Sequence, residues 1–441
     1  MRRIFDDFAY GAGTRSGCWW DDTCHIHPRP QLDASGTADV VVVGAGFTGL
    51  SAARTLAEGG VSVCVLDMNQ IGWGASGRNG GFCCLGGAKA GDGELDRIFG
   101  RSARLEYRAA EKSAVAHVED FLDEHSVDVD RHSKGETALA HRPKDMEEFD
   151  RSVRSYEENY GFTPEITKQG DLAAQGFGGP FYGAMTVPVG FALNPRKYIN
   201  ALAEQAENAG VKVFENSPVT SIRRGPKGWR ITSGQHEIVA SNVVLATNGY
   251  SSDDIPEWLA SRYIPSQSTV LVTRPMSQEE LDAQAWSSDQ MSYDTRNLLH
   301  YFRLLPDRRF LFGMRGGLLT GPAAETRARQ RTRADFEKMF PAWRHVENQT
   351  TWSGFVSLAR RKVPFIGEVP GNGGMWASMC YHGNGVAMGS YAGHLLGKLI
   401  LGESEASVPE VMRHPLQKFP FGRARRVVMP PVYAQFMLKD V

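Results

Sequence analysis

Three glycines near the start of the chain have the spacing of a phosphate-binding turn. Gly44, Gly46 and Gly49 form G-x-G-x-x-G directly after four consecutive valines, and small residues dominate from Ser51 to Ala57. Gly44 permits a tight turn from strand to helix, Gly46 lets the backbone approach a pyrophosphate, and Gly49 lets the helix pack closely on the sheet. The N–H groups that open the helix face the phosphates. The pattern therefore predicts a site for nucleotide phosphates.

An acidic residue follows where a dinucleotide site requires one. Gly59 and Gly60 end the predicted helix, an apolar strand runs over 61–66, and Asp67 stands at its end. A carboxylate in that position accepts hydrogen bonds from both hydroxyls of an adenosine ribose. The next three residues are not basic, so a 2′-phosphate has no cation to bind and NADP is disfavoured.

A second glycine-rich loop distinguishes between the remaining dinucleotides. Residues 74–81 read Gly-Ala-Ser-Gly-Arg-Asn-Gly-Gly. A nicotinamide enzyme has no need of such a loop directly after the ribose-binding strand, whereas FAD lies extended and its isoalloxazine ring must pass close to the main chain. A plain surface turn is the alternative for any Gly/Ser/Asn cluster. Four glycines and one arginine at this place favour FAD.

Several further motifs occur in a characteristic order. They are CWWDD (18–22), GASGRNGG (74–81), ALNPRKYINAL (192–202), LATNGY (245–250), DTRNLLHYFRLLPD (294–307) and YHGNGV (381–386). In these motifs the chain resembles the D-amino-acid-oxidase-like superfamily of FAD-dependent amine oxidoreductases, which includes sarcosine oxidase and glycine oxidase. Within it, the sequence is most similar to the gamma-glutamylputrescine-oxidase-like branch. The resemblance runs from about Trp19 to about Leu401 and is more specific for fold and cofactor than for substrate.

The resemblance implies an α/β fold in which two domains are interleaved. One is a Rossmann-like FAD-binding domain, and the other is an α+β substrate domain built on an antiparallel sheet. The nucleotide-binding pattern does resume late in the chain, because Asn194-Pro195 opens a helix that Gly210 ends. We expect the FAD-binding domain to comprise residues 1–100, 192–262 and 352–441, and the substrate domain to comprise residues 101–191 and 263–351.

The same resemblance implies which segments touch the cofactor. The strand around Val219 contacts the adenine end, and the LATNGY turn closes over the cofactor. The helix that starts in the YHGNGV loop presents free N–H groups, which would stabilise the negative charge of a reduced flavin. The predicted FAD-binding residues are Gly44, Ala45, Gly46, Phe47, Thr48, Gly49, Asp67, Met68, Gly74, Ala75, Ser76, Arg78, Asn79, Gly80, Gly81, Val219, Thr247, Asn248, Gly249, Gly383, Asn384, Gly385 and Val386.

Four residues are candidates for the catalytic set. Tyr301 and Arg303 share one face of a strand that lines the cavity over the flavin in the family, and Phe302 points to the other face. His382 is a candidate for assisting deprotonation of the amine, because histidine titrates near the working pH. Asn384, in the same loop, completes the set.

Other substrate contacts stay open at this level. Arg315 and Arg361 are further cationic candidates, and Trp352 and Phe355 could supply an apolar wall. Each also has an ordinary interpretation as a surface arginine or a core aromatic residue. Sarcosine-oxidase-like members have a carboxylate-binding lysine where this chain has Ala387, so a small N-methyl amino acid is disfavoured as substrate.

The implied reaction is the oxidation of a primary or secondary amine by hydride transfer to flavin N5. The imine is then hydrolysed to an aldehyde plus an amine, and O2 reoxidises the flavin and gives H2O2. We expect a gamma-glutamylputrescine-type or related N-substituted amine. Three alternatives stay open: a dehydrogenase of the same fold that passes electrons to a quinone or carrier, an NAD-dependent oxidoreductase, and a flavin-fold protein without turnover. No cysteine stands near 352–354, where sarcosine oxidases attach flavin, and Cys380 is not at that position, so non-covalent FAD is expected.

Composition narrows the class of protein. The chain has 49 Lys plus Arg and 50 Asp plus Glu, which gives no electrostatic case for nucleic acid. Its apolar runs are of strand length, short of the ~20 residues that a membrane helix needs. The irregular spacing of six cysteines argues against a disulfide framework, and the Cys18–His27 cluster lacks the close pairs of a zinc site. We expect a cytoplasmic enzyme without metal, nucleic-acid partner or membrane segment, and leave its oligomeric state open.

Overall fold

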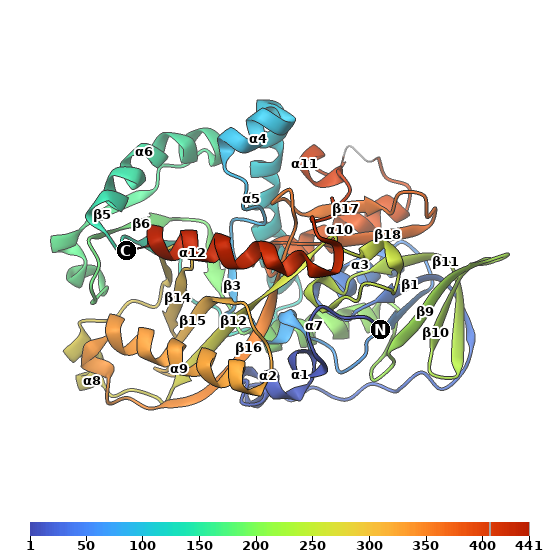
Figure 1. The fold of residues 1–441 in the computed structure, drawn as a ribbon, viewed down its shortest axis with the longest axis horizontal. Coiled ribbons are helices and arrows are strands. Elements are labelled where there is room, and N and C mark those ends of the chain that lie inside the picture. The colour runs from blue at the N-terminus through green and yellow to red at the C-terminus, as the bar shows by residue number, and fades with distance from the viewer. Residues whose placement is uncertain (405–406, 441) are drawn as a thin grey trace.

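Two large β-sheets organise the protein. The computed structural model describes residues 1–404 and 407–440, and within them each of these sheets has eight strands. Figure 1 shows the first sheet in the right half of the molecule and the second in the left half. A small third sheet pairs β3 (Phe82–Cys84) with β7 (Gly190–Ala192). The expected α/β class, with two sheets of different kind, is confirmed.

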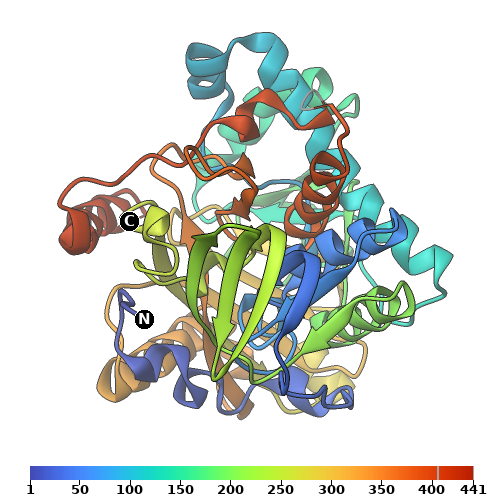
Figure 2. The same ribbon diagram turned by 90° about the vertical axis from the view of Figure 1, so that its right-hand side faces the viewer.

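The first sheet is largely parallel and has the order β17-β18-β11-β1-β2-β8, with the β9–β10 hairpin attached to β11. The four valines of β1 are buried, as expected for a parallel strand that is covered on both faces. Figure 2 shows the β9–β10 hairpin in yellow-green beside β11, which lies in the interior of the sheet between β18 and β1. The strands are β1 (Gly36–Val43), β2 (Val63–Leu66), β8 (Lys212–Phe214), β9 (Val219–Gly225), β10 (Gly228–Ser233), β11 (His236–Leu245), β17 (Phe365–Glu368) and β18 (Met375–Met379).

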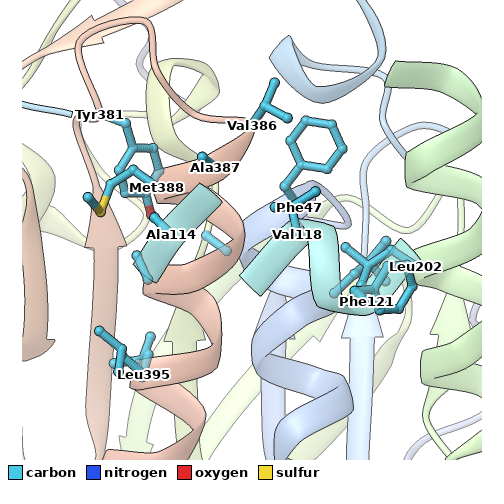
Figure 3. Close-up of a cluster of buried hydrophobic side chains, with 14 of the residues drawn as sticks. Phe47, Ala114, Val118, Phe121, Leu202, Tyr381, Val386, Ala387, Met388 and Leu395 are labelled. Atoms are coloured by element: carbon cyan, nitrogen blue, oxygen red, sulfur yellow. The ribbon is translucent and has the colours of Figure 1, made fainter. Parts of the chain in front are cut away.

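Four helices share an apolar core beside this sheet. They are α3 (Phe47–Glu58), α5 (Arg101–Glu124), α7 (Pro195–Asn208) and α10 (Ala387–Ile400). Figure 3 shows Phe47 of α3, Phe121 of α5, Leu202 of α7 and Leu395 of α10 in one buried cluster. Helix α5 was expected in the substrate domain, yet it packs against α10 and shares the apolar cluster of α3 and α7 beside the first sheet. The side chain of Asn194 accepts the Arg196 N–H and caps α7 as predicted.

The second sheet is mainly antiparallel, in the order β16-β12-β15-β14-β13-β4-β6-β5, with β13 and β4 parallel. One face packs on an aromatic core that includes Trp286, Phe302 and Phe340, beneath α8 (Gln278–Gln284) and α9 (Pro322–Met339). The strands are β4 (Glu136–Leu139), β5 (Glu165–Lys168), β6 (Gly183–Val187), β12 (Ile264–Thr273), β13 (Met291–Asp294), β14 (His300–Leu304), β15 (Phe310–Gly317) and β16 (Asn348–Leu358).

The expected domain limits and the sheets do not coincide everywhere. Strand β16 belongs to the second sheet and runs to Leu358, past the expected boundary at residue 351. The expected final segment, 352–441, also contains residues 405, 406 and 441, which lie outside the described residues. The domain division stays a prediction, but the interleaving of the two sheets along the chain is clear in Figure 1.

The C-terminal segment, which ends in helix α12 (Met429–Lys439), contacts the loop after β11 and strand β12 of the second sheet. Figure 1 shows α12 as the dark-red helix in front of the molecule. Before it, Arg425 pairs with Asp253 at 2.7 Å. On the helix, the hydroxyls of Tyr433 and Ser266 lie 2.6 Å apart. No helix of the described chain is both long and apolar enough to span a lipid bilayer. The remaining helices are α1 (Asp7–Tyr10), α2 (Ala12–Arg15), α4 (Asp92–Phe99), α6 (Pro143–Tyr160) and α11 (Glu410–Arg413).

Candidate active site

A cavity of about 450 Å³ lies between the carboxyl edge of the first sheet and one face of the second. Its size is typical of a site for a cofactor or small molecule. The loops after β1, β2, β11 and β18 meet there because parallel strands end at the same edge. Every predicted FAD-binding residue lines the cavity except Gly49, Gly81 and Gly249.

The glycine turn has the close contacts that its sequence predicts. Gly44 has φ +108°, and a Cβ there would lie 2.9 Å from the Ala246 carbonyl oxygen. A Cβ on Gly49 would lie 1.9 Å from the Gly44 carbonyl oxygen, so Gly49 serves the packing of helix on strand. A Cβ on Gly46 would lie 2.9 Å from Ser76 Oγ. Any side chain at Gly46 would therefore fill the space between the two glycine loops.

Asp67 is fixed at the cavity by its own backbone contacts. One carboxylate oxygen accepts the Ala45 N–H at 2.7 Å, and the other accepts the Asn69 N–H at 2.9 Å. Burial raises the pKa of Asp67 to about 6. The carboxylate retains free lone pairs toward the cavity, so it fits a ribose that donates hydrogen bonds.

One cation at the Asp67 end of the cavity escaped the sequence analysis. Arg3 lines the cavity, its Nη2 lies 2.8 Å from Met68 Sδ, and its guanidinium packs over the Tyr10 ring at 4.4 Å. Its buried Nε has no partner among the described residues. No motif marks Arg3, because the N-terminal segment reaches the cavity only through folding.

Arg78 anchors the second glycine loop. Its Nε donates to the Trp73 carbonyl at 2.9 Å, and its Nη1 donates to the Ser353 carbonyl at 3.1 Å. Trp352 in turn donates its indole N–H to the Arg78 carbonyl at 2.8 Å. Trp352 is fully buried behind this loop and is absent from the cavity lining, so the expectation that it forms an apolar wall is wrong. Phe355 does line the cavity.

His382 borders the cavity, but both of its ring nitrogens are occupied by backbone. Nδ1 lies 2.9 Å from the Gly87 carbonyl, and Nε2 accepts the Ala359 N–H at 3.1 Å. Burial lowers the pKa of His382 to about 4. The lone pair on Nε2, which a base would need, already accepts the Ala359 N–H. The expected role of His382 in deprotonating the amine therefore does not fit this geometry, and His382 instead ties two loops together.

Arg303 and Arg361 also lie outside the cavity lining. Arg303 is fully buried, donates to the Leu193 carbonyl at 2.8 Å and lies 3.0 Å from His132 Nε2. A Cβ on Gly81 would lie 2.4 Å from Arg303 Nη2, so the glycine loop covers this arginine. Neither arginine is positioned to contact a ligand in the cavity.

Arg315 is the cation that the fold directs into the cavity. Strand pairing sets Ser268 beside Arg315 and Tyr301 beside Gly313, so these side chains share the cavity-facing side of the second sheet. The hydroxyls of Tyr301 and Ser268 lie 3.0 Å apart. Arg315 donates a long hydrogen bond of 3.4 Å to the His382 carbonyl and has no ion-pair partner within the described residues. An anionic group in the cavity would therefore find an uncompensated guanidinium.

Asn384, in the loop before α10, and Ala387, the first residue of α10, differ in their surroundings. Asn384 lines the cavity and donates its side-chain N–H to the Leu85 carbonyl at 2.6 Å. Ala387 is buried in the apolar cluster of Figure 3 and does not line the cavity. The position thus offers neither a charge nor room for one.

Two buried thiols near the cavity differ in orientation. Cys380 does not line it, and its Sγ lies 3.4 Å from Ser357 Oγ. Burial raises the pKa of Cys380 to about 12. Cys84 does line the cavity, and burial raises the pKa of its thiol well above the ordinary value. Both sulfurs are protonated at neutral pH and are poor nucleophiles.

The cavity also contains charged residues that sequence reasoning missed. Glu136 of β4 and Lys89, in the loop after β3, both line it. Part of the Lys89 side chain stays exposed, yet desolvation by the surrounding protein lowers the pKa of its ammonium to about 8. No sequence signal separates these two residues from ordinary surface charges.

Comparisons with known proteins agree with this arrangement. A family model described as FAD dependent oxidoreductase (DAO) matches residues 39–399. The gamma-glutamylputrescine oxidoreductase of Escherichia coli is 28% identical over 415 residues, covering 94% of this chain and 95% of that protein. The probable oxidoreductase OrdL of Haemophilus influenzae is 27% identical over 403 residues, covering 90% and 91%. The crystal structure of glycine oxidase from Geobacillus kaustophilus matches with a TM-score of 0.69 at 20% identity, covering 86% of this chain and 99% of that one, which indicates a shared fold.

Proposed function

Because the chain belongs to the DAO family of FAD-dependent oxidoreductases, whose members among its relatives act on amines or amino acids, we propose that it oxidises an amine that also carries a carboxylate. The gamma-glutamylputrescine type is our leading candidate. The observation that carries the proposal is that one cavity is lined both by the two glycine loops and by the uncompensated Arg315. The similarity to a gamma-glutamylputrescine oxidoreductase along nearly the whole chain supports it.

The residues around the cavity fit FAD. The two glycine loops leave a cradle that a Cβ at Gly46 would fill, Asp67 offers acceptors for a ribose, and the first turn of α10 begins at the cavity edge with Val386. When bound, FAD would supply the hydride acceptor for the carbon next to the substrate nitrogen. The resulting imine would be hydrolysed to an aldehyde and an amine, and we propose O2 as the final electron acceptor, with H2O2 as its product. We propose non-covalent binding, since Cys380 does not line the cavity and the thiol of Cys84 is protonated.

The protein's own side chains would orient the substrate and exclude water. Arg315 would bind the carboxylate, and the linked hydroxyls of Tyr301 and Ser268 would border the chain of the substrate. Sarcosine and glycine carry their carboxylate one carbon from the reacting nitrogen, where Ala387 supplies no cation, whereas a longer substrate could place its carboxylate at Arg315; this disfavours sarcosine and glycine. A buried carboxylate without a cation loses several kcal/mol, roughly the 3–5 kcal/mol of a broken buried pair.

An anaerobic reduction experiment tests the function. The purified flavoprotein is mixed with gamma-glutamylputrescine, sarcosine or glycine, and loss of oxidised-flavin absorbance is followed. We expect rapid reduction by gamma-glutamylputrescine and slow reduction by the two small amino acids. Admission of O2 should then restore the flavin and release one H2O2 per substrate. Restoration only by a quinone would support a dehydrogenase, and absence of reduction by every amine would contradict the proposal.

A pair of variants tests the role of Arg315. Arg315→Met should raise KM for gamma-glutamylputrescine by about 10- to 100-fold, because a charged hydrogen bond to the carboxylate is lost. Arg361→Met is the matched control, since Arg361 does not line the cavity, and should leave KM unchanged. Equal effects of the two substitutions would count against a carboxylate site at Arg315.

A further inference from the structure

One partly buried carboxylate on the cavity wall, Glu136, lacks the ion-pair partner that several buried carboxylates of the protein have. Elsewhere in the described chain, Glu111 pairs with Arg108 at 2.9 Å and Asp253 pairs with Arg425 at 2.7 Å. Glu136 takes part in no ion pair among the described residues, and its side chain has the Cys84 thiol as hydrogen-bond partner. Buried charges in proteins are normally paired. An unpaired carboxylate that lines a cavity is therefore available for a cation from outside the protein.

Strand register sets Glu136 on the same wall as Arg315. Glu136 pairs with Met291 on β13, and Tyr293 of β13 pairs with Tyr301 of β14. Directly paired residues point to the same side of a sheet, so Glu136, Tyr293, Tyr301 and Arg315 share the cavity-facing side. Three strand spacings separate β4 from β15, which is roughly 14 Å between backbones. The wall thus has a carboxylate at one end and a guanidinium at the other.

The surroundings of Glu136 determine its protonation. It faces the Cys84 thiol from β3 and Tyr293 from β13, while Arg315 from β15 and Glu111 from α5 act on it from farther away. Tyr156 of α6 is also near enough to be influenced by it. Burial, opposed by the Cys84 hydrogen bond and by Arg315, raises the pKa of Glu136 to about 7. The carboxyl therefore titrates in the range where enzymes transfer protons.

We propose that Glu136 binds the cationic nitrogen of the substrate and accepts a proton from it, an inference that rests on the proposed amine oxidation. An N–H bond of the ammonium breaks, an O–H bond forms on Glu136, and the electron pair stays on nitrogen. This gives the neutral amine that loses hydride readily. The reaction needs no oxidant at this step, and the enclosed site that disfavours a charged carboxylate also disfavours the charged ammonium.

Other groups around the cavity are less suited to this role. The lone pair of His382 accepts the Ala359 N–H. The Tyr301 hydroxyl is linked to Ser268, and burial raises its pKa. Lys89 in its charged form would repel an ammonium, although its pKa of about 8 makes it the second candidate for a base. Glu136 alone among these four combines negative charge with a titration near neutrality.

Charge removal at Glu136 tests the proposal. Glu136→Gln preserves the shape, and its FAD content is measured first to establish folding. We expect kcat/KM for gamma-glutamylputrescine to fall about 100-fold or more. The decline of kcat/KM below about pH 7 in the wild type should disappear in Glu136→Gln. Glu136→Asp, which keeps the charge, should retain that pH dependence with a partial rate.

Two controls separate this role from general effects. Glu165→Gln removes an exposed carboxylate from β5 of the same sheet and should behave as the wild type. Lys89→Met should leave the pH dependence in place if Glu136 is the base. The proposal would be overturned if the decline of kcat/KM below about pH 7 disappeared in Lys89→Met and persisted in Glu136→Gln.

A binding measurement distinguishes failure of the inference from failure of the function. Gamma-glutamylputrescine is titrated anaerobically while the flavin spectrum is recorded. If gamma-glutamylputrescine bound to and rapidly reduced both the wild type and Glu136→Gln to the same extent, the role of Glu136 would be overturned and the proposed function would stand. Binding that depends on Glu136 without any reduction would support the cation site and refute the oxidation. If the wild type showed no binding and no reduction, both the proposed function and the role of Glu136 would be refuted.

Discussion

Replacing His382 by alanine tests whether this side chain is structural or catalytic. The imidazole connects the Gly87 carbonyl to the Ala359 N–H, at 2.9 and 3.1 Å, and is buried. Its loss leaves one donor and one acceptor without partners, and each costs about 1–3 kcal/mol. We therefore expect the free energy of unfolding to fall by about 2–6 kcal/mol.

Thermal unfolding of the apoprotein measures this loss. At about 2.1 cal/mol/K of unfolding entropy per residue, a chain of 441 residues should show a midpoint lower by about 2–6 °C in His382→Ala. His27→Ala removes an exposed histidine and should change the free energy by less than about 0.5 kcal/mol. The flavin of folded His382→Ala should still be reduced by the substrate.

The pH dependence of stability gives a second measurement. The pKa of His382 falls from 6.5 to about 4 because burial disfavours its charged form. The neutral imidazole thus contributes stability that is fully present above pH 6.5 and is lost as the pH falls through about 4. The difference between wild type and His382→Ala should shrink over that range. An unchanged midpoint together with a loss of kcat and of the acidic limb of the rate profile would refute the structural role.

Three other predictions concern the cofactor and the cavity wall. Gly46→Val should purify as a folded, colourless protein, because its side chain fills the space that the pyrophosphate needs; a full complement of FAD would contradict the loop assignment. Asp67→Ala should weaken FAD binding by about 1–3 kcal/mol, roughly 5- to 150-fold, in a flavin-fluorescence titration, and unchanged affinity would exclude a ribose contact. Acid precipitation should leave FAD in the supernatant, whereas a yellow pellet would indicate attachment to a cysteine, with Cys84 the first to examine by peptide mapping.

The sequence by itself was enough to predict which residues of the first two glycine loops surround the cavity. The roles of Gly44, Gly46 and Gly49 are local, since they depend on one turn between a strand and a helix. Asp67 could be located because the ends of adjacent parallel strands meet at one edge. The resemblance to the family then extended this prediction to the loops after β11 and β18, and both loops line the same cavity.

The substrate end could not be predicted in this way, because register and covering loops determine which side chains are free. Arg303 and Arg315 occupy neighbouring strands with similar patterns. Only the folded structure shows that the Gly81 loop covers Arg303 while Arg315 faces the cavity. His382 likewise resembles a base in sequence, yet its Nδ1 partner, Gly87, lies 295 positions earlier in the chain.

Glu136 shows most clearly what only the tertiary structure decided. In sequence it is an ordinary glutamate at the start of a short strand, with no motif around it. Pairing of β4 with β13 brings it onto the wall that also holds Arg315, and partial burial without an ion-pair partner raises its pKa. Local geometry follows from neighbouring residues, but the charge state of a side chain depends on the water and partners that distant segments remove or supply.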